Sequence, residues 1–153
     1  MLKNLDPLLT PDLLYVLRAM GHGDVLTLVD SNFPADSVAS STIHGEVIRL
    51  DGVGTTEAAR AILSVFPLDS FIETPLQYMQ VVGEPDTKLE VHEELHQAAL
   101  EGTERDWKLG SVERFDFYDL ARNTYAVVAT CERRPYGCFF LTKGVIGPDG
   151  QVV

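Results

Sequence analysis

The chain has 153 residues, which fits one domain of ordinary size, and 45% of them are apolar, enough to form a hydrophobic core. Its 23 acidic and 12 basic residues give a formal net charge of -11, so nucleic acid and anionic membrane surfaces, which would repel it, are excluded as partners. We expect no membrane span, no signal peptide, and reduced thiols at Cys131 and Cys138, as in a cytoplasmic protein.

The first elements along the chain are a helix and a strand. Thr10 is a helix N-cap, followed by proline at the first helical position and an acid in the first turn. Apolar residues at helical spacing continue to residue 20, and Gly21 is the expected stop. Residues 25–29 then predict a strand apolar enough to be covered on both faces, ending at Asp30.

Strand and helix patterns keep alternating along the rest of the chain, with no linker or internal repeat between them. This alternation predicts an α/β fold, a single three-layer domain over residues 1–153 with a central, largely parallel sheet and helices on both faces. The expected strands are 47–50, 76–82, 125–130 and 139–142, and the expected helices are 55–66 (capped by Thr55 or Thr56), 90–101 and 115–123.

His22 lies between Gly21 and Gly23, where the helix pattern gives way to a strand. No bulky neighbour shields its imidazole, and histidine is the side chain whose unperturbed pKa lies nearest neutral pH. The pattern fits either a proton-transfer group or a histidine on a surface loop. Asp30 leaves a similar choice, because it either faces a ligand beyond the end of a strand or caps the following turn.

The segment His92-Glu93-Glu94-Leu95-His96 matches the zinc-protease pattern H-E-x-x-H. On a helix the two histidines would share one face, with Glu93 nearby as a base. A zinc site would also need a third protein ligand, and nothing downstream offers one at a familiar spacing. We therefore expect no metal site and interpret residues 90–101 as an exposed acidic helix with two histidines.

Several short motifs follow one another in a specific order along the chain, although each is weak alone. Together they resemble the fucose mutarotase and ribose pyranase family from Leu2 to about Val145, least well over residues 83–108. Gly23 and the Arg-Phe-x-Phe-Tyr run look more like the L-fucose mutarotase branch. The motifs are residues 7–14 (PLLTPDLL), 20–24 (MGHGD), Asp30 with 32–34 (NFP), 48–52 (IRLDG), 67–70 (PLDS), 114–118 (RFDFY), 130–132 (TCE), 136–138 (YGC) and 143–145 (KGV).

This resemblance implies a cofactor-free isomerase, a mutarotase that interconverts the α and β anomers of a free monosaccharide, with L-fucose as the expected sugar. It implies ring-shaped homo-oligomers, a decamer being one candidate size, with sugar sites near subunit contacts. Without the resemblance, we would interpret Arg114 as a charged surface residue and Tyr136 as an aromatic residue in a turn after a proline. The resemblance assigns the acid/base role to His22 and sugar contacts to Asp30, Arg114, Tyr136, Gly137 and Cys138.

The chain departs from the family pattern at its two cysteines. The fucose branch has asparagine where this chain has Cys138, and glycine where it has Cys131. A thiol is a weaker hydrogen-bonding partner than an amide, so the identity of the sugar stays open. A ribose pyranase-like activity, or a non-catalytic sugar-binding or sugar-transport accessory protein on the same fold, are the alternatives.

His22 and Asp30 are eight positions apart, which creates a geometric problem for a shared site. An extended connection would place their Cα atoms roughly 26 Å apart at about 3.3 Å per residue. One monosaccharide cannot bridge that distance. We therefore expect either a strongly bent connection or a site that draws on two subunits.

Overall fold

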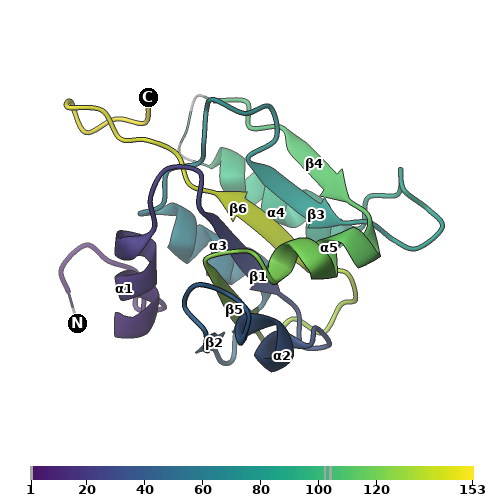
Figure 1. The fold of residues 1–153 in the computed structure, drawn as a ribbon. Coiled ribbons are helices and arrows are strands. Elements are labelled where there is room, and N and C mark those ends of the chain that lie inside the picture. Colours follow the sequence, from purple (N-terminus) through teal and green to yellow (C-terminus); the bar gives the residue numbers. More distant parts are fainter. Residues whose placement is uncertain (1, 102, 104) are drawn as a thin grey trace.

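The computed structural model describes residues 2–101, 103 and 105–153. Helices and strands alternate along most of the chain, and Figure 1 shows one central sheet with helices in front of it and behind it. The elements are α1 (Pro11–Ala19), β1 (Val25–Val29), α2 (Ala35–Ala39), β2 (Val47–Leu50), α3 (Thr55–Leu63), β3 (Leu76–Met79), α4 (Glu90–Leu100), β4 (Leu109–Val112), α5 (Arg114–Ala121), β5 (Ala126–Thr130) and β6 (Phe139–Thr142).

The six strands form one sheet in the order β2-β5-β1-β6-β3-β4. The pairs β2–β5, β1–β5 and β3–β4 are parallel, whereas β6 runs antiparallel between β1 and β3. The prediction of a largely parallel sheet is confirmed. Because only β6 is reversed, its amino end lies at the same edge of the sheet as the carboxyl ends of the other five strands.

Side chains alternate between the two faces of the sheet and build a core on each. Leu26 and Leu28 of β1 pack with α1, α3 and α4 in one apolar cluster. Val29 and Val127 pack with α2 and α5 in the other. The predicted arrangement of three layers is therefore confirmed (Figure 1). In the described part of the chain, no helix is both long and apolar enough to span a bilayer.

The helix boundaries differ in part from those predicted. Thr10 does cap α1, because its hydroxyl accepts the Leu13 amide at 3.3 Å. However, α1 ends at Ala19, and it is Gly23, at φ +83°, rather than Gly21, that takes the left-handed conformation of the following turn. The capping prediction for Thr55 or Thr56 is wrong: α3 begins at Thr55 itself, after an N-cap at Gly54 with no side-chain bond.

Two elements were not predicted, and one strand is shorter than expected. Helix α2 has five residues and begins after Pro34, which offers no capping side chain. Strand β4 lies at the edge of the sheet with all four residues half-buried, so it shows no apolar alternation. Strand β3 ends at Met79, because the chain turns back through a bridge between Val81 and Glu84.

The interpretation of α4 as an exposed acidic helix is wrong on one face. Val91, His92 and Leu95 are fully or almost fully buried. The His92 ring stacks on Tyr78 of β3, with ring centroids 4.1 Å apart. The acidic residues therefore occupy only the outer side of the helix, and the face toward the sheet is apolar and aromatic.

Candidate functional site

A pocket of about 250 Å³ lies at the sheet edge where the carboxyl ends of the parallel strands meet. Asp30 follows β1, Arg114 follows β4, and Cys138 precedes the antiparallel β6. This edge is where ligands of open α/β sheets usually bind. The lining residues are Asp30, Asn32, Phe33, Met79, Arg114, Tyr118, Pro135, Tyr136 and Cys138.

Asp30 is buried; it caps the following turn, and it also lines the pocket. Its Oδ1 accepts the amides of Asn32 and Phe33 at 2.9 and 3.1 Å, which caps the turn after β1. Its Oδ2 accepts the amide of Gly137 at 3.1 Å. A carboxylate offers about four acceptor positions, and these amides occupy three of them.

Arg114 brings positive charge to the pocket from the first turn of α5. Its guanidinium carbon lies 5.7 Å from the ring centroids of both Phe115 and Tyr118. A hydrogen bond with Tyr118 raises the pKa of Arg114, so the group stays charged. Within the described residues no carboxylate lies within 4 Å of this guanidinium. The donors of Arg114 that do not engage Tyr118 are therefore available to a ligand.

Cys138 lines the pocket, and Gly137 before it lies where the loop passes very close to its neighbours. A Cβ at Gly137 would lie 2.9 Å from Cγ of Glu132 and 3.4 Å from Cβ of Asp30, so only glycine fits. Burial and the nearby Asp30 carboxylate raise the pKa of the Cys138 thiol well above its ordinary value. Cys138 therefore presents a neutral, weakly polar group, and both cysteines of the chain are free.

An ion-pair network holds the loop that carries Tyr136. The guanidinium of Arg134 donates to both oxygens of Glu132, at 3.0 and 2.9 Å, and to Glu94 of α4 at 2.9 Å. Arg134 lowers the pKa of the Glu132 carboxyl to about 2. This network connects the loop to α4, and sequence motifs gave no sign of it because Glu94 and Arg134 are 40 residues apart.

His22 lies in the turn before β1, at the edge of the sheet where the amino ends of the parallel strands lie, opposite the pocket. Its side chain is 49% exposed, and its Nε2 is 3.2 Å from Oδ2 of the buried Asp69. The Phe71 ring lies next to it, with ring centroids 5.4 Å apart. The expected accessibility of this imidazole is confirmed, and its carboxylate partner is a residue that the sequence alone did not single out as functional.

Lys143 fixes the turn that carries His22. Its ammonium donates to the carbonyls of Leu17 and Met20 at 2.6 and 2.5 Å, at the end of α1. Its own carbonyl accepts the amide of Gly23 at 2.8 Å. Since Lys143 directly follows β6, the antiparallel strand connects the two edges: Cys138, which precedes the strand, lines the pocket, and Lys143, which follows it, supports the His22 turn.

The predicted site residues thus form two groups within one chain. Asp30, Arg114, Tyr136 and Cys138 line the pocket at one edge, Gly137 is bonded to Asp30 there, and His22 is at the other end of β1. The strand between them is regular, and the only bend in the connection is the turn that carries His22. The two groups therefore lie beyond opposite ends of β1, whose five residues alone span about 16 Å at about 3.3 Å per residue.

The H-E-x-x-H pattern does not build a metal-binding geometry. The Nε2 atoms of His92 and His96 lie 3.0 and 2.6 Å from the carbonyl oxygens of Tyr136 and Trp107. Both histidines are therefore engaged with backbone groups. Among the described residues, no three potential metal ligands come together.

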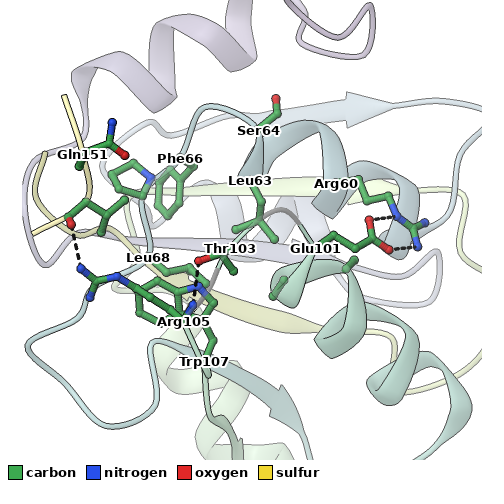
Figure 2. Close-up of a pocket in the computed structure, with 14 residues that line it drawn as sticks. Arg60, Leu63, Ser64, Phe66, Leu68, Glu101, Thr103, Arg105, Trp107 and Gln151 are labelled. Atoms are coloured by element: carbon green, nitrogen blue, oxygen red, sulfur yellow. Dashed lines mark hydrogen bonds and ion pairs between the residues drawn. The ribbon is translucent and has the colours of Figure 1, made fainter.

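A larger cleft, of about 730 Å³, lies between α3, the end of α4 and the C-terminal segment (Figure 2). Its charged groups already have partners: Arg60 makes two hydrogen bonds to Glu101, and Arg105 donates to the carbonyl of Val152. None of the predicted site residues lines it. The small pocket at the sheet edge is therefore the candidate site.

This fold and pocket define an α/β protein with one central sheet, whose edge offers a small pocket that holds a carboxylate and a guanidinium. Comparison with known proteins shows which protein family has this fold. The chain belongs to the RbsD / FucU transport protein family, whose model matches residues 3–146. The resemblance indicated by the sequence motifs is confirmed.

Several relatives cover nearly the whole chain. The L-fucose mutarotase of Actinobacillus pleuropneumoniae serotype 5b is 44% identical over 146 residues, which are 95% of this chain and 97% of that protein. The fucose mutarotase of Homo sapiens is 40% identical over 149 residues, 95% of this chain and 94% of the relative. The structure of the Streptococcus pneumoniae fucose mutarotase in complex with L-fucose aligns with a TM-score of 0.83 and 37% identity, covering 95% and 100% of the two chains.

Proposed function

We propose that this protein is a mutarotase that interconverts the α and β anomers of free L-fucose. The observation that carries the proposal is the small pocket in which Asp30, Arg114 and Tyr136 converge, in a chain 44% identical to an L-fucose mutarotase. The carboxylate can accept hydrogen bonds from sugar hydroxyls, and the guanidinium can donate to sugar oxygens. The Tyr136 ring can pack on the apolar face of the sugar.

Mutarotation needs proton transfer at two oxygens of the sugar. A base removes the proton of the anomeric hydroxyl while an acid protonates the ring oxygen, and the bond from C1 to the ring oxygen breaks. The open aldehyde then closes on its other face by the reverse steps. A positioned group that both donates and accepts protons contributes about 10²–10⁴-fold, and we assign this role to His22, with no cofactor.

The position of His22 supports a site completed by a second copy of the chain. A monosaccharide bound beside Asp30 and Arg114 is out of reach of the imidazole of the same chain, because β1 separates them. The exposed His22 of one copy, set beside the pocket of another, would bring all the groups together. A ring-shaped homo-oligomer, with a decamer as one candidate size, is the corresponding assembly, and a cytoplasmic location remains a prediction.

Mixing two inactive variants tests this arrangement. His22→Ala and Arg114→Ala each remove one half of the site, and chains of both kinds would assemble together after joint refolding. If each site uses His22 of one copy and Arg114 of another, about a quarter of the sites in an equal mixture regain both groups. If each site belongs to one chain, the mixture stays inactive.

Saturation-difference NMR on the anomers of L-fucose tests the activity itself. Transfer of saturation between the anomers above the buffer rate supports the mutarotase. Binding of fucose without added exchange would favour a non-catalytic sugar-binding or transport-accessory protein instead. Exchange with D-ribose but not L-fucose would favour a ribose pyranase-like activity.

A further inference from the structure

His92 of α4 is a fully buried histidine that the proposed reaction does not use. Its ring stacks on Tyr78 and meets Phe139 edge-on, with ring centroids 4.1 and 5.9 Å away. Both neighbours belong to the central sheet, so the imidazole is fixed between α4 and the strands. A histidine at such a position has a defined orientation for each ring nitrogen.

The hydrogen bonds of His92 determine which of its nitrogens carries the proton. The amide of Leu89 donates to Nδ1 at 3.1 Å, so Nδ1 is unprotonated. Nε2 therefore carries the hydrogen and donates it to the carbonyl oxygen of Tyr136 at 3.0 Å. Burial lowers the pKa of His92, which agrees with this neutral form.

The carbonyl that His92 holds belongs to a peptide unit of the pocket wall. The nitrogen of the same peptide, the amide of Gly137, donates to Oδ2 of Asp30 at 3.1 Å. This peptide is thus held at its oxygen by His92 and at its nitrogen by Asp30. Tyr136 itself has φ 63°, a left-handed conformation that non-glycine residues rarely adopt. A peptide in this conformation needs partners on both sides to stay in one orientation.

We propose that His92 is a positioning residue for sugar binding, acting through the peptide between Tyr136 and Gly137. By fixing that carbonyl, it directs the Tyr136 ring along the pocket and keeps the Gly137 amide on Asp30. The orientation of Asp30, and therefore its remaining acceptor position for a sugar hydroxyl, depends on the same contact. This inference rests on the proposed function, since it concerns the same pocket.

Two amide substitutions separate the two hydrogen bonds of His92. In His92→Gln, the longer side chain places its amide group near Nε2 and can still donate to the Tyr136 carbonyl. In His92→Asn, the shorter side chain can still accept from Leu89 at the start of α4 but does not reach Tyr136. His96→Gln is the matched control, because His96 lies one turn further along α4 and bonds the carbonyl of Trp107, away from the pocket.

We expect His92→Asn to raise KM for L-fucose about tenfold, the value of one lost hydrogen bond. The kcat should change much less, because His22 and its carboxylate are untouched. His92→Gln and His96→Gln should keep KM close to that of the wild type. A purely structural role predicts a lower Tm for His92→Asn with an unchanged KM at temperatures well below Tm, and this result would overturn the proposal.

NMR of the wild-type protein gives a second test that depends neither on catalysis nor on a variant that folds. The ¹⁵N spectrum of the imidazole should show a proton on Nε2 of His92, and titration with L-fucose should shift this signal but not that of His96. A binding response without anomer exchange would reject the mutarotase and keep the positioning role. Saturable fucose binding that leaves the His92 signal unmoved would reject the positioning role, whatever the activity.

Discussion

Nε2 of His22 lies 3.2 Å from Oδ2 of Asp69, although the two residues are 47 positions apart in the sequence. The Asp69 side chain is only 4% exposed, and its Oδ1 accepts the amide of Phe71 at 3.0 Å, so the carboxylate is fixed in place. The imidazole is half exposed. With Nε2 directed at the carboxylate, Nδ1 is the nitrogen free to exchange a proton with a ligand.

Asp69→Asn should lower kcat for anomer exchange about tenfold to a hundredfold, with little change in fucose affinity. The asparagine oxygen can still accept the Phe71 amide, so the loop is kept, but the charge that orients and stabilises the protonated imidazole is lost. Saturation-difference NMR measures kcat and a separate fucose titration measures affinity. A kcat equal to that of the wild type would show that Asp69 does not assist His22.

Glu132→Gln should lower the free energy of unfolding at neutral pH. It should also make that free energy depend less on pH in the acidic range. In the wild type Arg134 lowers the pKa of Glu132 from 4.5 to about 2. A carboxyl with a lowered pKa stabilises the folded state above its unfolded pKa, and this contribution is lost as the pH falls from about 4.5 to about 2. The loss at neutral pH should be on the order of 2–3 kcal/mol, measured by urea unfolding over a pH series.

The control for this experiment is Glu73→Gln, which breaks an exposed ion pair. Glu73 and Lys108 are both largely exposed, with their charged atoms 3.0 Å apart. Such pairs contribute about 0–1 kcal/mol, so the free energy of unfolding should hardly change. Equal losses of unfolding free energy in Glu132→Gln and Glu73→Gln would mean that the Glu132 network stabilises the fold no more than an exposed ion pair does.

The two thiols should differ strongly in reactivity toward iodoacetamide. Cys131 is exposed, whereas Cys138 is buried and has a raised pKa, so its reactive thiolate is scarce at mildly alkaline pH. Mass spectrometry of the folded protein should find the label on Cys131 alone, and Cys131→Ser should abolish rapid labelling. Labelling of Cys138 at a comparable rate would show that the pocket wall opens more readily than this packing implies.

Much of the fold was predictable because long helices and buried strands leave a clear periodic pattern. Helix α1 shows this well, with its Thr10 cap and its apolar face. Helix α2 and strand β4 were missed because one has no capping side chain and the other no alternating burial. The antiparallel direction of β6 could not be predicted either, since strand order and direction depend on contacts between distant segments.

The site was only partly predictable, for a related reason. The family resemblance placed Asp30, Arg114 and Tyr136 in a common site, and the structure brings them together in one pocket. The resemblance did not indicate the contact of Asp69 with His22. Nor did it indicate the hydrogen bond from His92 to the Tyr136 carbonyl, because each of these contacts spans more than 40 residues. The regular spacing along β1 did predict that His22 would lie far from the pocket of its own chain.

The central claim, that His22 is the acid/base group of a fucose mutarotase, is tested most directly by the rate of anomer exchange in His22→Ala. Saturation-difference NMR on L-fucose measures this rate, and a fucose titration of the same sample verifies that the pocket still binds. We predict that exchange falls to the buffer rate while binding persists. Exchange at the wild-type rate in this variant would contradict the account.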